Sequence, residues 1–165
     1  MARYVKRKEI MLFIDTTPNS SPTWKLVGNG MTTGAYTYDA TEETETYIVD
    51  DSATTLVEQY TVSLDGEMKC LFGDDVYDYI NGLRRSLATG TDAEQHALLI
   101  DKYDESTADH FVAQKFDSSI SISSYGGDGG ATPTIGFKVN LNGTPTDGTA
   151  TISGGIPTFT PNGSV

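Results

Sequence analysis

Alternation of apolar and polar residues with a period of two is the feature that most restricts what this chain can fold into. It has no exception in residues 134–141 and 119–123, and one exception on its apolar face, Glu58, in residues 56–65. Because successive side chains of a strand point to opposite faces of a sheet, this pattern is typical of strands with one buried face. The sequence therefore predicts half-buried antiparallel strands.

Shorter segments rich in β-branched and aromatic residues extend this prediction to most of the chain. They cover residues 10–15, 24–27, 33–38, 47–50, 97–103, 110–116 and 149–153. Turn-forming pairs separate most of them, and the pairs Asn142-Gly143 and Asp147-Gly148 predict a loop that joins two antiparallel strands. The expected fold is mainly β, an antiparallel β-sandwich or barrel.

A single helix stands out against this background. Apolar residues between positions 75 and about 88 recur at spacings of four, three and four, which is one face of a 3.6-residue repeat. Asp74 offers an N-cap, and Gly90 can close the helix. Arg84 and Arg85 lie near the negative end of the helix dipole, where positive charge is favourable. We therefore expect one α-helix that flanks the β structure.

Two segments differ from ordinary connections. Residues 39–55 are acidic and mostly polar, which predicts a long loop, and residues 125–133 are glycine-rich. After Ser153 the chain is rich in Gly, Pro and Thr, which predicts a flexible C-terminal tail over residues 154–165. With no internal repeat, residues 1–153 are expected to form a single domain.

Acidic residues outnumber basic ones, 23 to 11, and the basic residues gather at the N-terminus. Four of the eleven lie in the first eight positions, whereas nine acids and no base lie between Lys25 and Lys69. Nucleic-acid affinity depends on Lys and Arg that neutralise phosphates, so this distribution excludes a nucleic-acid-binding surface outside the N-terminal segment. Solubility alone is the other explanation of such acidity.

The residue types that carry catalysis or bind metals are sparse and scattered. His96 and His110 are the only imidazoles, and the single cysteine, Cys70, lies in an apolar run, so neither a nucleophile with a base nor a zinc site is indicated. Residues 126–130 lack the lysine and the following helix of a phosphate-binding loop. We predict no enzyme and no catalytic, cofactor-binding or metal-binding residue. The longest apolar run, residues 10–14, is far too short to cross a membrane.

Several segments, taken together, carry a resemblance to a known family. They are a short basic start, Trp24-Lys25-Leu26-Val27-Gly28-Asn29-Gly30-Met31, the long acidic segment, the helix beginning Gly73-Asp74-Asp75-Val76-Tyr77-Asp78-Tyr79-Ile80, and a closing part with Gly136-Phe137-Lys138-Val139-Asn140-Leu141-Asn142-Gly143 and Gly148-Thr149-Ala150-Thr151-Ile152. In this arrangement the chain resembles the major tail proteins, or tail tube subunits, of long-tailed bacteriophages over residues 5–153.

The resemblance implies a fold, an assembly and a set of partners. Subunits of this family form homohexameric rings that stack into a hollow tail tube, and DNA passes through the lumen without specific binding. The resemblance therefore implies a protein of the virion tail, made in the cytoplasm of the host bacterium. Tape-measure and tail-terminator proteins are the further partners that it implies.

The resemblance also assigns roles to particular residues. The long loop would reach the adjacent ring with its acids Glu42, Glu43, Glu45, Asp50 and Asp51. Because like charges repel, that contact needs a basic complement, for which the candidates are Arg3, Lys6, Arg7, Lys8, Arg84 and Arg85. The candidate lumen face consists of Gln59, Thr61, Ser63 and Asp65, or of the polar face of residues 134–140, where Lys138 has the wrong sign. We expect the loop to become ordered only on assembly.

A second function remains open at this point. An isolated β-sandwich could act as a binding module that recognises carbohydrate or protein at a cell surface. Its contact residues would be Trp24, Tyr36, Tyr38, Tyr47 and Tyr60. Self-assembly separates the two hypotheses, because a tube subunit forms rings whereas a binding module stays monomeric.

Overall fold

The computed structural model describes residues 1–163, which contain eight strands, one α-helix and two short 3₁₀ helices. The strands are β1 (Ile10–Asp15), β2 (Trp24–Leu26), β3 (Ala35–Glu45), β4 (Thr54–Lys69), β5 (Glu94–Thr107), β6 (His110–Gly126), β7 (Thr134–Ser153) and β8 (Ile156–Pro161). The helices are α1 (Asp75–Ser86), η1 (Arg7–Glu9) and η2 (Gly90–Ala93).

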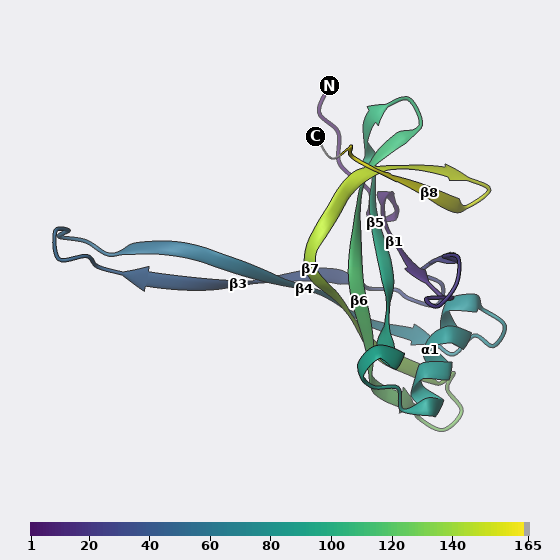
Figure 1. Cartoon of the computed structure of the whole chain (residues 1–165). Coiled ribbons are helices and arrows are strands. Elements are labelled where there is room, and N and C mark those ends of the chain that lie inside the picture. Colours follow the sequence, from purple (N-terminus) through teal and green to yellow (C-terminus); the bar gives the residue numbers. More distant parts are fainter. Residues whose placement is uncertain (164–165) are drawn as a thin grey trace.

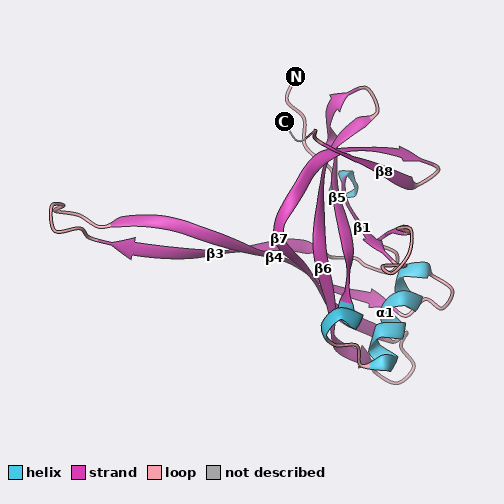
Figure 2. Ribbon diagram, viewed as in Figure 1, coloured by secondary structure: helices cyan, strands magenta, loops and turns pink. Residues whose placement is uncertain are grey.

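All eight strands belong to one sheet. Its order is β2-β1-β5-β6-β7-β4-β3, and β8 pairs with β7. Every pairing within the described residues is antiparallel, and α1 lies beside the sheet (Figure 2). The predicted fold class, mainly antiparallel β with one flanking helix, is confirmed. The β3–β4 hairpin leaves the rest of the molecule, which we call the body, as a long projection (Figure 1).

The sheet is curled, so that residues from distant strands share one core. Leu12 of β1 and Leu64 of β4 are buried in the same cluster, although three strands separate β1 from β4 in the sheet order. Phe137 of β7 and Ile80 of α1 complete this cluster and are almost wholly buried. Burial of these apolar side chains is the main source of free energy that holds the body together.

A second, smaller core lies on the other face of the sheet. Phe13, Leu98 and Ile100 are fully buried there, and they alternate with residues of the first core along β1 and β5. Trp24 and Phe159 pack against them. Since both faces of β5 are covered, its sequence is continuously apolar over residues 97–100 instead of alternating.

α1 begins where the sequence predicts and ends slightly earlier. The Asp74 carboxylate accepts hydrogen bonds from the amides of Val76 (3.1 Å) and Tyr77 (3.0 Å), which satisfies two free donors of the first turn. The residue that ends the helix is Leu87, in the left-handed region at φ 50°, and not Gly90 as predicted. Gly90 instead opens η2.

The predicted loop at residues 142–148 is wrong, because β7 runs through it without a break. β6 pairs with both ends of this segment, with Asn142 opposite Asp117 and Asp147 opposite Gln114, and residues 143–145 form a bulge between them, with Gly143 at φ 68°. A hydrogen bond from Gln114 Nε2 to Asp147 Oδ1 (2.8 Å) fixes the register there. The local turn signals therefore coincide with a bulge within one strand and not with a loop between two strands.

The segment expected as a flexible tail contains a strand. β8 pairs with β7 from Ser153 opposite Ile156 to Gly148 opposite Pro161. Gly154 and Gly155, both at positive φ, form the turn between them. The β structure thus extends to residue 161. The last residues of the expected tail, 164 and 165, lie outside the described part.

Candidate assembly surfaces

The outer part of the β3–β4 hairpin, residues 37–61, forms what we call the arm. Every residue of the arm is exposed. The hairpin pairs from Ala35 opposite Asp65 to Glu45 opposite Thr54, and it extends away from the body (Figure 1). The arm is therefore a two-stranded ribbon without a covering layer.

The arm corrects the prediction of a long loop at residues 39–55. β3 and β4 extend far into this segment, and only residues 46–53 connect them. The strand predicted at residues 47–50 is instead part of the turn at the tip, where the Asp50 amide donates to the Tyr47 carbonyl oxygen (2.9 Å).

Strand pairing tolerates the acidity of this segment because of its register. Three glutamates of β3 each face a neutral residue of β4: Glu42 faces Val57, Glu43 faces Leu56 and Glu45 faces Thr54. Like charges directly opposite one another would destabilise the ribbon, and this register avoids them. Thr44 and Thr55 add a hydrogen bond between their hydroxyl groups (2.9 Å).

A β-bulge interrupts the arm near its middle. Thr41 lies opposite Gln59 but Glu42 lies opposite Val57, so Glu58 is the extra residue. Such an insertion bends a ribbon and increases its twist. Glu58 is also the residue that breaks the alternation in the sequence.

One face of the arm continues the surface of the first core into solvent. In register with the buried Leu64 and Val62, this face carries Tyr36, Tyr38 and Tyr60. Tyr38 is 56% exposed and Tyr60 is 60% exposed. An apolar stripe that runs from a core onto an uncovered ribbon is typical of a surface that another protein chain covers.

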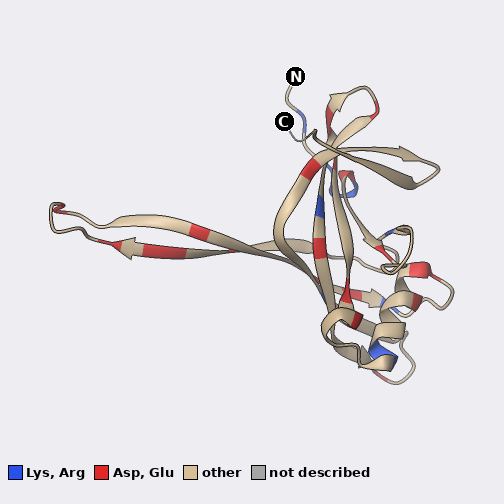
Figure 3. Cartoon of the chain, in the orientation of Figure 1, with Lys and Arg blue, Asp and Glu red and all other residues tan. Residues whose placement is uncertain are grey.

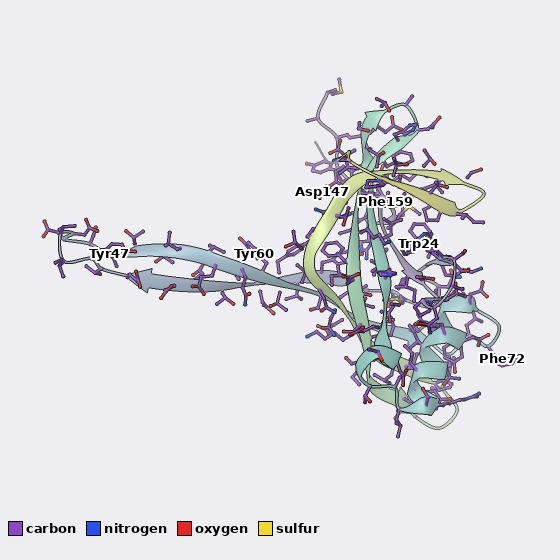
Figure 4. The ribbon with its side chains drawn as sticks, viewed as in Figure 1. Trp24, Tyr47, Tyr60, Phe72, Asp147 and Phe159 are labelled. Atoms are coloured by element: carbon purple, nitrogen blue, oxygen red, sulfur yellow. The ribbon has the colours of Figure 1, made fainter. Side chains whose placement is uncertain are left out.

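The tip of the arm combines apolar side chains with acids. Ile48 and Val49 are 105% and 85% exposed, and Tyr47 beside them is 51% exposed. Figure 4 shows Tyr47 at the end of the arm, far from the body. The arm holds seven acids and no base, and Figure 3 shows red segments and no blue one along it.

The acids predicted to contact an adjacent ring all lie in the outer half of the arm: Glu42, Glu43, Glu45, Asp50 and Asp51. All five are exposed. Their carboxylates form no ion pair with any residue in the described range 1–163.

Of the four N-terminal residues of the predicted basic complement, Arg3 and Arg7 are engaged within the subunit, whereas Lys6 and Lys8 are exposed and form no ion pair within residues 1–163. Arg3 pairs with Glu9 at 2.9 Å, and its hydrogen bonds hold the pKa of Glu9 at about 2. Arg7 donates to the carbonyl oxygens of Ile10 (2.7 Å) and Gly34 (3.0 Å), and its guanidinium lies 5.8 Å from the ring centre of Tyr36. Burial raises the pKa of Tyr36 to about 12.

The other two residues of the predicted basic complement lie at the end of α1. Arg84 donates from Nε to Asn81 Oδ1 (2.8 Å), and its guanidinium lies 3.9 Å from the ring centre of Tyr125. Arg85 is exposed. Neither arginine pairs with a carboxylate of residues 1–163. These two charges therefore remain uncompensated in the single chain.

An open groove of about 830 Å³ adjoins Arg84. One wall is the end of α1, with Leu83, Arg84 and Leu87, and the other is β6 over residues 119–125. We call it the α1–β6 groove. Leu87 is 81% exposed and Tyr125 is 51% exposed, so apolar surface lines its rim.

The four residues of the candidate lumen face differ in their exposure to solvent. Gln59, Thr61 and Asp65 are exposed, whereas Ser63 is buried with 2% of its surface exposed. Ser63 therefore contributes no exposed side chain to this face in the isolated subunit. Asp65 lies directly opposite Lys138 of β7, which brings opposite charges together on neighbouring strands.

The sequence reasoning missed the part that β6 plays in this polar face. Ser121 lies opposite Lys138, and Ser119 lies opposite Asn140, so the two candidate strands and β6 form one continuous polar surface. Asn140 Nδ2 donates to Ser119 Oγ (3.4 Å). The serine-isoleucine alternation at residues 119–123 was the available signal.

The aromatic residues proposed for a binding module do not gather at one place. Trp24 is half-buried against the second core, whereas Tyr47 lies at the tip of the arm (Figure 4). Tyr36 is half-buried at the base of the hairpin. Tyr36, Tyr38 and Tyr60 share one face of the hairpin, but Trp24 and Tyr47 do not join them in one contact surface within residues 1–163.

Groups associated with catalysis are dispersed in the structure as well. Within residues 1–163 no cluster of three or more His, Cys, Asp or Glu side chains could hold a metal ion. His96 contacts Asp117 at 3.1 Å in an exposed pair, and Cys70 is a half-buried free thiol. No helix in that range is long and apolar enough to span a membrane.

Comparison with known proteins gives similarity at the level of the fold. No family model matches the chain, and no curated protein matches its sequence. Among solved structures, the chain is similar to one from the tail of an empty GTA particle, computed with helical refinement and C6 symmetry. The TM-score is 0.58 at 12% identity, over 87% of this chain and 98% of the other. The chain thus shares its fold with a particle tail protein.

Proposed function

We propose that this protein is a structural virion protein, a tail tube subunit whose homohexameric rings stack into a hollow tube that delivers DNA. The exposed arm is the observation that carries this proposal. Support comes from the similarity in fold to the tail of a GTA particle with C6 symmetry.

The arm has a physical reason to bind another copy. A two-stranded ribbon by itself is marginally stable in water, because it buries too little apolar surface. Here the ribbon also exposes Tyr38, Leu56 and Tyr60 along its length and Ile48 at its tip. Contact with a neighbouring ring would bury this surface, and assembly would therefore stabilise the arm.

The polar sheet face suits a passage for DNA. We assign Gln59, Thr61 and Asp65 to the lumen, because these three polar side chains are exposed and none of them carries a positive charge. Lys138 lies opposite Asp65, which offsets its charge. Such a wall offers the phosphates of DNA no cluster of positive charges to bind. Tape-measure and tail-terminator proteins are the remaining partners of this proposal, and the host cytoplasm is the place of synthesis.

Electron microscopy of the negatively stained, concentrated protein tests the proposal. We expect rings or tubes for the full chain. The control is a variant in which residues 40–60 are replaced by Asn-Gly, which suits a two-residue hairpin between Asp39 and Thr61, opposite each other in the ladder. It should give the circular dichroism of a folded β protein and remain monomeric. A full chain that stays monomeric at millimolar concentration would contradict the proposal.

A further inference from the structure

The α1–β6 groove has a backbone edge that no strand covers. β5 begins at Glu94, opposite Ser119, so β6 is paired with β5 only up to that point. Between Ile120 and Gly126, β6 pairs with β7 alone. Unpaired strand edges readily bind another chain, and natural proteins usually protect them. The end of α1 stands beside this edge without closing it.

We propose that the α1–β6 groove receives the arm tip of a second copy of this chain. The inference rests on the proposed function, since it names the surface that the arm contacts in the assembly. The tip supplies the apolar side chains Ile48 and Val49, and the groove supplies Leu83 and Leu87. Ile48, Val49 and Leu87 are exposed within residues 1–163, and Leu83 is half-buried.

Charge complementarity selects this pairing. The tip carries Glu45, Asp50 and Asp51, none of them paired within residues 1–163. Arg84 lines the groove and Arg85 follows it in α1; neither pairs with a carboxylate of residues 1–163, and Glu94 is the one acid of the groove lining. Arg84 is held in place by Asn81 and Tyr125 before any partner arrives, so less entropy is lost on binding.

The contact must join different copies. The arm points away from the body on one side and α1 lies on the other (Figure 4), so a tip cannot reach the groove of its own chain. A contact between two different surfaces of the same protein is heterologous, and heterologous contacts propagate from copy to copy. This is the kind of contact that stacked rings require.

A second groove offers the competing site. It measures about 440 Å³ and is lined by Arg7, Lys8 and Leu26 among others. Arg7 already donates to two backbone carbonyl oxygens, and Arg3 nearby is neutralised by Glu9. Lys8 also lines this groove and pairs with no carboxylate of residues 1–163, so its charge competes for the acids of an arm.

Interchain cross-linking distinguishes the two grooves. Val49→Cys protein is mixed with Leu87→Cys protein, and the control mixture pairs Val49→Cys with Leu26→Cys; both partner positions are exposed, at 81% and 45%. After mild oxidation, peptide mapping identifies the disulfide and excludes those formed by Cys70. We expect a disulfide between positions 49 and 87 as the main interchain product under conditions where microscopy shows assemblies.

Each other result counts against the inference. Assemblies in which the disulfide between positions 49 and 26 dominates, or in which neither disulfide forms, would overturn the groove assignment and leave the tube proposal standing. Failure to assemble together with failure to cross-link would overturn both.

A charge exchange provides an independent test. Arg85→Glu and Asp51→Lys change exposed residues, so the fold should be unaffected. Each alone should raise the protein concentration needed for assembly by about tenfold or more, because like charges would then meet. The double variant should restore assembly toward that of the unmodified chain. Additive loss in the double variant would contradict the pairing.

Discussion

β4 is one strand with two halves, and the contrast between them separates what folds the chain from what assembles it. Its inner half, from Val62, places Leu64 and Met68 in the core, each with 1% of its surface exposed. Its outer half, from Thr54 to Thr61, is exposed throughout although it contains Leu56, Val57 and Tyr60. Apolar residues of the same strand therefore stabilise the subunit in the inner half and form an exposed surface for a partner in the outer half.

The largest effect that sharpens this contrast is expected in the core. Phe137→Ala should lower the free energy of unfolding of the isolated subunit by about 3–5 kcal/mol, because it leaves a cavity among residues that cannot collapse into it. Urea denaturation of dilute protein measures this change. A loss below about 1 kcal/mol would mean that the body is not held together by this core.

A glycine in the body should be less tolerant than one on the surface. Gly66→Ala would place a Cβ 2.7 Å from Phe137 Cζ and 2.9 Å from Met31 Cε, which should cost about 1–3 kcal/mol of unfolding free energy. The matched control is Gly82→Ala in α1, where nothing lies within 4 Å. Helix propensity predicts that this control gains about 1 kcal/mol. Equal thermal shifts in both variants would contradict the packing of β4 on β7.

The helix cap should have a smaller effect. Asp74→Ala removes the two hydrogen bonds to the Val76 and Tyr77 amides and should destabilise the subunit by about 1 kcal/mol. Asp78→Ala is the control, because it removes a first-turn acid without removing the cap. Calorimetry of both variants separates capping from the interaction with the helix dipole. A similar loss in both would show that charge and not capping is responsible.

A pH-dependent effect is expected at the outer end of β5. Burial, followed by the nearby Asp104, raises the pKa of Asp101 above its ordinary value. A carboxyl with a raised pKa in the folded state favours folding while it is protonated, below its unfolded pKa, and loses that contribution as pH rises through the folded pKa. Asp101→Asn should therefore raise the melting temperature at pH 7 and leave it nearly unchanged at pH 3. A lower melting temperature at pH 7 would contradict this assignment.

The smallest effect on the isolated subunit is expected in the arm. Leu56→Ala should change the free energy of unfolding by less than about 0.5 kcal/mol, since this side chain is already 54% exposed. In the proposed tube, hydrogen exchange should show greater protection of residues 39–61 in the assembled state than in the free subunit. Equal protection in both states would mean that the arm stays solvated after assembly.

The fold was predictable where the hydrophobic pattern reflects contacts within one chain. The alternation at residues 134–141 and the repeat in α1 both correspond to faces that pack in the body, except that Leu87, the last residue of the repeat, is exposed. The helix end was not predictable, because Leu87 adopts a left-handed conformation that glycine usually takes. The break predicted at residues 142–148 was wrong because β6 pairs with both ends of this segment and the turn signals coincide with a bulge within one strand.

The candidate surfaces were predictable in position but not in form. The acidic segment was recognised as unusual, yet the register that places each glutamate of β3 opposite a neutral residue cannot be read from the sequence alone. The separate states of Arg3, paired with Glu9, and Arg85, unpaired within residues 1–163, likewise depend on the three-dimensional arrangement. The α1–β6 groove requires knowledge of where β5 begins, and no motif marks that position.

The bulge at Glu58 affects the direction of the arm but not the pairing of its residues. Deleting this one residue would leave every cross-strand pair of the ribbon in place, because Gln59 and Val57 already face Thr41 and Glu42. The local bend and the added twist would disappear. The presence of this one residue would thus set the angle at which the arm of one copy extends toward the next, while the residues that contact the neighbour stay the same.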